Sequence, residues 1–188
     1  ILQIVDSLFI SIRWQKKCIY LNGHSGGGSF IFGFLDAIAK IPEYVQRITF
    51  LDSNYGYDSS YYPKFQNWIN ENKKATITVF AYNDSVALYN GKPVVSAKGG
   101  TWYKSRRMMS HFMNEFDFRK VKDDSLTIQL SKNKRIGFFF KTNPEQKIFH
   151  THQVELNGFI HSILFNTRKE SKRYTYFGQR AYNDLIPN

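Results

Sequence analysis

Hydrophobic and polar positions along the chain predict strands and helices that follow one another in turn. Short apolar or β-branched runs predict strands, and apolar residues at helical spacing predict helices. The predicted strands span 18–21, 47–51, 75–81, 126–130 and 136–140, and the predicted helices span 29–41, 63–72, 101–116 and 159–165. Apolar positions at helical spacing over residues 1–12 predict one more helix, which begins without a cap.

This alternation predicts an α/β fold, a mainly parallel sheet with helices on both faces. The turn at 131–134 predicts that the last two strands form a hairpin, and Thr101 is a plausible helix cap. Active sites in such sheets lie at the carboxyl ends of the strands. We expect the domain to cover residues 1–166, followed by a basic, tyrosine-rich tail over 167–188.

Composition narrows the class of protein without identifying its function. The chain has 188 residues with 42% hydrophobic content, enough for one domain with a sizeable core. Its one cysteine, Cys18, excludes an internal disulfide and lies in an apolar run, so we expect a buried thiol. No apolar run of about 18 residues occurs, so we expect no membrane span.

The net charge of +11 raises the question of an anionic partner. The basic residues are scattered through the chain at 16–17, 73–74, 106–107, 132–135 and 168–173, mostly at ends of predicted elements. Because no continuous basic stripe forms, we do not expect nucleic acid as the partner. The charge instead favours acidic substrates or partners.

The segment LNGHSGGG, residues 21–28, joins a predicted strand to a predicted helix. It lacks the lysine of a phosphate-binding loop and the glycine order of a dinucleotide fingerprint. It does fit G-x-S-x-G over Gly23 to Gly27. We expect Ser25 to occupy a tight turn between glycines as a nucleophile, with the N–H of Gly26 in an oxyanion hole. A purely structural turn is the alternative.

A serine nucleophile needs a base and an acid that orients the base. Asp84 follows the strand at 75–81 and is the preferred acid, and Asp52, after the strand at 47–51, is the alternative. For the base we favour His161, which follows a glycine, over His152 and then His150.

The remaining histidines are expected to have other roles. We expect His24 to be structural and His111 to lie on a helix as a surface or packing residue. His150 and His152 lack a third ligand of clear spacing, so we predict no metal site.

In these features the chain resembles the α/β-hydrolase superfamily. The resemblance rests on GHSGGG after CIYLN, on FLDSNYGYD and FAYND after further strands, and on NGFIH, and it covers roughly residues 17–166. It implies hydrolysis of an ester or amide through an acyl-enzyme on Ser25, with His161 as base, Asp84 orienting it and no cofactor. The alternative is a non-catalytic binding module of the same fold for an acidic partner.

The resemblance also implies what the substrate and the rest of the protein supply. Superfamily members carry about half of their sheet before the tight turn that holds the nucleophile, here the turn at Ser25. We therefore expect a further N-terminal segment in the same protein to provide the second oxyanion donor. The loop at 85–100 and the tyrosines at 55, 57, 61 and 62 lie near the predicted rim. Small-molecule, carbohydrate-ester and peptide substrates all remain open.

Overall fold

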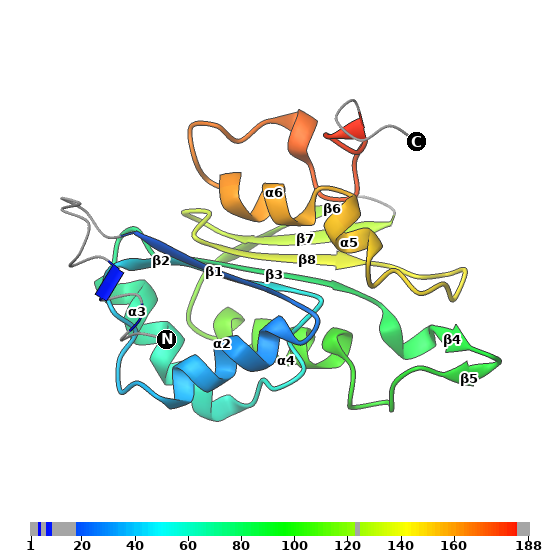
Figure 1. Ribbon diagram of the computed structural model, residues 1–188, viewed down its shortest axis with the longest axis horizontal. Helices are drawn as coiled ribbons and strands as arrows, with labels where there is room; N and C mark the ends of the chain where they lie inside the picture. The colour runs from blue at the N-terminus through cyan, green and yellow to red at the C-terminus, as the bar shows by residue number, and fades with distance from the viewer. Residues whose placement is uncertain (1–3, 5–6, 9–17, 123–124, 184–188) are drawn as a thin grey trace.

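A computed structural model describes residues 4, 7–8, 18–122 and 125–183, and its centre is one six-stranded sheet with helices on both faces (Figure 1). The helix predicted over residues 1–12 lies largely outside the described residues. No helix in the described ranges is long and apolar enough to cross a membrane.

The sheet is mainly parallel, as predicted. Its strand order is β1-β2-β3-β8-β7-β6. The pairs β1–β2, β2–β3 and β3–β8 are parallel. β7 and β6 continue the sheet through antiparallel pairs, so the hairpin of β7 and β8 is confirmed. The bounds are β1 Ile19–His24, β2 Val45–Leu51, β3 Thr76–Tyr82, β8 Ile136–Lys141, β7 Leu126–Ser131 and β6 Phe118–Lys122.

Helices cover the sheet unequally. α2 (Gly27–Asp36), α3 (Tyr62–Glu71) and α4 (Thr101–Met113) lie on one face, and the short α5 (His152–Glu155) and α6 (Gly158–Leu164) lie on the other (Figure 1). The loop between β3 and α4 carries a small hairpin of β4 (Leu88–Tyr89) and β5 (Lys92–Pro93). Three 3-10 turns, η1 (Ser59–Tyr61), η2 (Asp84–Val86) and η3 (Lys172–Tyr174), complete the described elements.

The two-residue period of the strands builds two hydrophobic clusters. In β8, Phe138 and Phe140 pack with the larger cluster beneath α2, α3 and α4, whereas Phe139 points into the smaller cluster beneath α5 and α6. Phe80 of β3 joins Phe139 on that second face. Because both faces of β3 and β8 are covered, every residue of β3 and all but the last residue of β8 are buried, as is typical of central parallel strands.

Some expectations for single elements were wrong. Cys18 is exposed, and its Sγ lies 3.2 Å from Oε1 of Gln46, because β1 begins one residue later, at Ile19. The N-cap of α4 is Gly100, and the side chain of Thr101 makes tertiary hydrogen bonds instead of a cap. α2 ends at Asp36 rather than at residue 41. β6 and α5 were not predicted.

Part of the segment expected as a tail belongs to the core. Tyr176 is fully buried in the smaller cluster, where its ring packs edge-on against Phe80 at 4.8 Å between centroids. Its hydroxyl donates to Oε1 of the buried Gln153 at 2.7 Å. The chain therefore contributes to the domain core beyond residue 166.

Candidate active site

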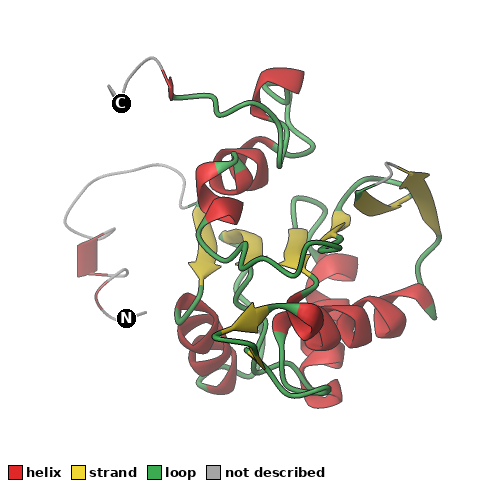
Figure 2. Cartoon of the chain, turned by 90° about the vertical axis from the view of Figure 1, so that its right-hand side faces the viewer, coloured by secondary structure: helices red, strands yellow, loops and turns green. Residues whose placement is uncertain are grey.

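The carboxyl ends of β1, β2, β3 and β8 lie at one end of the sheet, which faces the viewer in Figure 2. Ser25 follows β1 directly and has φ 55°, a left-handed conformation that non-glycine residues rarely adopt. Gly26 and Gly27 then begin α2. The side chain of Ser25 is partly exposed, and no hydrogen bond to its Oγ occurs within the described part of the chain. A free hydroxyl on a strained turn is therefore present where the motif predicts it.

The glycines around Ser25 differ in what they permit. A Cβ at Gly23 would lie 2.6 Å from the carbonyl of Gly27, and a Cβ at Gly28 would overlap the carbonyl oxygen of Ser53. Gly26 and Gly27 have open space around them. Close packing therefore requires glycine at 23 and 28, whereas Gly27, the second glycine of the motif, is not required by packing.

A buried carboxylate and a histidine form the centre of this end of the sheet. Asp52, with φ 45°, follows β2 and is 1% exposed. Nδ1–H of His150, in the loop after β8, donates to Oδ2 of Asp52 at 2.5 Å. This hydrogen bond is the main cause that raises the pKa of His150, against the opposing effect of partial burial. Nε2 of His150 makes no hydrogen bond to any described residue.

His24 connects His150 to the turn that holds Ser25. Its Nε2–H donates to the backbone carbonyl of His150 at 3.0 Å, and the two imidazole rings lie 4.5 Å apart between centroids. His24 directly precedes Ser25, so one covalent neighbour of the serine touches the histidine that Asp52 holds. The structural role expected for His24 thus includes positioning His150.

Asp84 lies on the other side of Thr101. The backbone N–H of Thr101 donates to Oδ2 of Asp84 at 2.7 Å, which caps the start of α4. A Cβ at Gly100 would overlap this carboxylate, so the close approach requires glycine. The hydroxyl of Thr101 donates to Oδ1 of Asp52. Thr101 therefore connects both candidate acids.

The electrostatic state of Asp84 differs from that of an ordinary carboxylate. Burial is the largest cause that raises the pKa of Asp84, and repulsion from Asp52 adds to it, while hydrogen bonds from the start of α4 oppose the shift. Its Oδ1 is buried without a hydrogen-bond partner. The group therefore favours the protonated form more than a solvated aspartate does.

The structure does not bring the two preferred residues, Asp84 and His161, together. His161 lies in α6, between the rings of Phe139 and Phe165, where burial lowers its pKa. Its Nδ1 accepts the N–H of Tyr176 at 3.1 Å, and its Nε2 is buried without a partner. His161 is a neutral core histidine, and the acid–histidine pair that forms uses the two alternatives, Asp52 and His150.

The remaining histidines stand outside this pair. His152, the second-ranked base, begins α5 with an exposed side chain and packs edge-on against Phe149. His111 of α4 has Nδ1 2.7 Å from the hydroxyl of Tyr57 and packs as expected. Within the described residues, no group of three potential ligands comes close enough to hold a metal ion.

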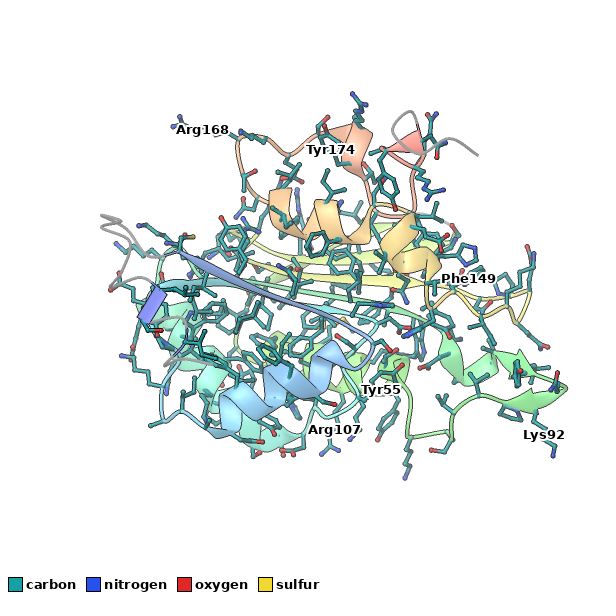
Figure 3. All side chains as sticks on the ribbon, viewed as in Figure 1. Tyr55, Lys92, Arg107, Phe149, Arg168 and Tyr174 are labelled. Carbon is teal, nitrogen blue, oxygen red and sulfur yellow. The ribbon has the colours of Figure 1, made fainter. Side chains whose placement is uncertain are left out.

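Of the tyrosines predicted near the rim, one remains available there. Tyr57 is buried, and Tyr61 and Tyr62 pack on Phe32 and Phe112. Tyr55 is 41% exposed, and burial of part of its ring together with Asp52 and Asp84 raises the pKa of its hydroxyl. Figure 3 labels Tyr55 at the end of the sheet that carries these carboxylates.

Two positioning residues, Thr101 and His24, were not predicted in these roles. Thr101 is separated from Asp52 by a long stretch of sequence, and only its place directly after Gly99 and Gly100 hinted at a close approach. His24 had a clearer signal, because it is adjacent to the serine.

The chain matches no protein-family model, and neither the curated proteins nor the solved structures that were compared with it include a significant match. The geometry of this site is therefore the basis on which a function is proposed.

Proposed function

We propose that the protein is a serine hydrolase with an α/β-hydrolase-like arrangement, in which Ser25, His150 and Asp52 form the catalytic triad. The observation that carries the proposal is the hydrogen bond between His150 and Asp52 beside a serine with positive φ. The order nucleophile, acid, histidine along the chain is the order of that superfamily.

Activation of the nucleophile follows from the tautomer of His150. Since Nδ1–H donates to the carboxylate of Asp52, Nε2 carries the lone pair of the neutral ring. Nε2 takes the proton of Ser25 Oγ as this oxygen attacks the substrate carbonyl. The imidazolium that forms is stabilised by the negative charge of Asp52. It then returns the proton to the leaving alcohol or amine.

The start of α2 supplies stabilisation of the oxyanion. Gly26 is the N-cap residue of this helix, so its N–H lies among the unpaired donors at the positive end of the helix. The tetrahedral intermediate places its negative oxygen near the N–H of the residue that follows the nucleophile. An N–H at Gly26 serves this purpose, and water then hydrolyses the acyl-enzyme by the reverse sequence of proton transfers.

The bond class is an ester or amide, because both react through an acyl-enzyme on serine. Tyr55 offers a partly exposed ring near the carboxylates, suited to stacking on a sugar or on an aromatic group. This favours carbohydrate esters and aromatic acyl esters or peptides as the first substrates to screen.

The decisive test is covalent labelling with a fluorophosphonate, read by intact mass. The wild-type chain should gain one adduct, because the reagent phosphonylates only an activated serine, and Ser25→Ala should gain none. Ser29→Ala is the matched control, since Ser29 is an exposed serine in the first turn of α2, and it should label as the wild type does.

Two results would contradict the proposal. Labelling that persists in Ser25→Ala would assign the reactive group elsewhere. A folded wild-type chain that gains no adduct, in the longest form of the protein available, would favour a non-catalytic binding module.

A further inference from the structure

Three cationic side chains surround one hollow in the C-terminal segment, on the α6 side of the sheet. The hollow has a volume of about 400 Å³ and is lined by Lys172, Arg173, Gln179, Arg180, Ala181 and Asn183. Among the residues that the structure describes, no carboxylate lines it and none forms an ion pair with these cations. Three like charges at one hollow repel one another, so an anion bound there would relieve that repulsion.

Each of the two guanidinium groups lies over an aromatic ring. Cζ of Arg180 lies 4.8 Å from the ring centroid of Tyr182, and Cζ of Arg173 lies 5.9 Å from that of Tyr174. Stacking orients a guanidinium while its N–H donors, which lie in its plane, stay free. Nε of Arg180 is shielded from solvent and has no hydrogen-bond partner among the described residues, and one N–H of Arg173 donates to the carbonyl of Ala181 over 3.5 Å.

The wall of the hollow is anchored to the core by Asn157. This buried residue adopts φ 69°, and its Nδ2 donates to the carbonyls of Thr175 at 3.1 Å and Gln179 at 2.7 Å. Its Oδ1 accepts the N–H of Ala181 at 2.9 Å. The backbone on both sides of Arg180 is therefore fixed, which lowers the entropy cost of ordering the site around a ligand.

We propose that this hollow binds the phosphate group of a small phosphorylated molecule through Lys172, Arg173 and Arg180. The arginine fork matches two phosphate oxygens at once, and lysine adds a compact charge. The volume exceeds that of one phosphate group, which leaves room for part of the sugar or nucleoside attached to it. This site goes beyond the proposed hydrolase activity and does not depend on it.

The test is calorimetric titration of the full chain with inorganic phosphate, then with glucose 6-phosphate and adenosine monophosphate. The proposal expects saturable binding of phosphate and tighter binding of at least one ester, and the two esters distinguish a sugar phosphate from a nucleotide. Arg180→Gln should weaken binding about tenfold or more, and Arg180→Lys should fall between the two because it keeps the charge and loses the fork.

Arg106→Gln is the matched control, since Arg106 also stacks on an aromatic ring, Trp102, but belongs to α4 on the opposite face of the sheet (Figure 1). It should bind phosphate as the wild type does. Circular dichroism checks that each variant is folded, and Lys172→Gln, an exposed position, replaces Arg180→Gln if that variant does not fold.

The proposal is overturned if phosphate and both esters give no saturable heat, or if the folded Arg180 variant, or Lys172→Gln in its place, binds as tightly as the wild type. Binding of a single-stranded oligonucleotide without binding of any small phosphate compound would also overturn it, and would assign the basic segment to nucleic acid. That binding would weaken steeply with added salt.

Discussion

The hydroxyl of Thr101 donates to Oδ1 of Asp52, the oxygen that His150 leaves unused. Both oxygens of this buried carboxylate thus have a partner, and neither partner is water. The carboxylate is fixed in position between the start of α4 and the loop that follows β8. The orientation of the His150 ring depends on this arrangement.

Thr101→Val should lower the rate of fluorophosphonate labelling while the backbone cap of α4 persists. The variant removes the donor to Oδ1 of Asp52 but keeps the N–H that donates to Asp84. Loss of a hydrogen bond to a charged group costs about 1.5–3 kcal/mol, which corresponds to a rate reduction of about tenfold to a hundredfold if it falls on the transition state. Thr101→Ser keeps the hydroxyl and should restore most of the rate. Equal rates in all three proteins would exclude a positioning role for the hydroxyl.

The labelling rate should rise with pH through an inflection above about 6.5, the ordinary pKa of histidine. Asp52 raises the pKa of His150, and the base must be neutral to accept the proton, so activity appears only as the pH passes this raised value. The same pair stabilises the fold below the unfolded pKa of histidine, and this contribution is lost as the pH rises through the folded pKa.

Asp52→Asn should shift that inflection to lower pH and reduce the limiting rate about a hundredfold or more, because the amide no longer stabilises the imidazolium. Rates measured across the pH range in both proteins decide this. An inflection that does not move between wild type and Asp52→Asn would show that the titrating group is not His150.

Asp84→Asn should retain labelling, whereas the sequence alone made Asp84 the preferred acid. An asparagine oxygen still accepts the N–H of Thr101, and the change removes the repulsion between Asp84 and Asp52. When the pKa of a carboxyl is higher in the folded state than in the unfolded state, the stability of the protein falls as the pH rises from the unfolded pKa through the folded one. An amide does not titrate and causes no such loss. Urea unfolding near neutral pH should therefore show Asp84→Asn at least as stable as the wild type. A rate as low as that of Asp52→Asn would restore Asp84 as the orienting acid.

Exchange of the histidines one at a time separates the three candidate bases. His150→Gln should abolish labelling, since it removes the group bonded to Asp52. His161→Gln should label within about twofold of the wild type, because His161 is buried in α6 with an aromatic environment and only supports the fold. His152→Gln, at an exposed position, should also label normally. Loss of labelling in a folded His161→Gln would contradict the assignment of His150.

His161 also gives the fold a sensitivity to acid. Burial lowers its pKa, so the folded state resists protonation, and stability should fall as the pH drops through the unfolded pKa of histidine towards the folded one. Unfolding curves of His161→Gln should lose part of this decline relative to the wild type. An unchanged decline would place the acid-sensitive group elsewhere.

Gly28→Ala should destabilise the protein, and Gly27→Ala should not. A Cβ at 28 overlaps the carbonyl oxygen of Ser53, so α2 and the loop that follows β2 must separate, at a cost of about 3 kcal/mol by the measure of overpacked cores. Gly27 opens α2 with free space around it, where alanine adds up to about 1 kcal/mol of stability through its helix propensity. Chemical unfolding of the two variants checks this; equal stabilities would mean that the turn is looser than described.

The fold could be predicted from the sequence where local pattern decides structure. β3 is rich in β-branched residues, β8 is nearly all apolar, and α3 and α4 keep a helical period, so each was found near its true bounds. β6 is an edge strand with the sequence FRKVK, and its charged residues leave no run of apolar residues that would indicate a strand. α5 is a single turn, which is too short to show a helical period.

Ser25 was predicted from a local motif, whereas the pairing of a carboxylate with a histidine depends on tertiary contacts. Asp52 and Asp84 both follow a strand, and pattern alone cannot show that Asp84 caps α4 while Asp52 meets a histidine. Gly158, which precedes His161, favoured this histidine as the base, but Gly158 is the first residue of α6, and the face of α6 on which His161 lies packs against the aromatic cluster. Whether a histidine lies in a loop at the end of the sheet or on a buried face of a helix is decided by tertiary packing. The local sequence around the histidine does not contain that information.

The contact between His24 and His150 links the proposed base to the residue that precedes the proposed nucleophile. Any shift of the end of β1 carries Ser25 and His24 together, and the hydrogen bond from His24 draws the His150 loop with them. This contact therefore makes the position of His150 relative to Ser25 less dependent on the other loops at this end of the sheet. A substitution at His24, which touches no substrate in the proposed mechanism, would remove this contact. The position of His150 relative to Ser25 would then be less fixed.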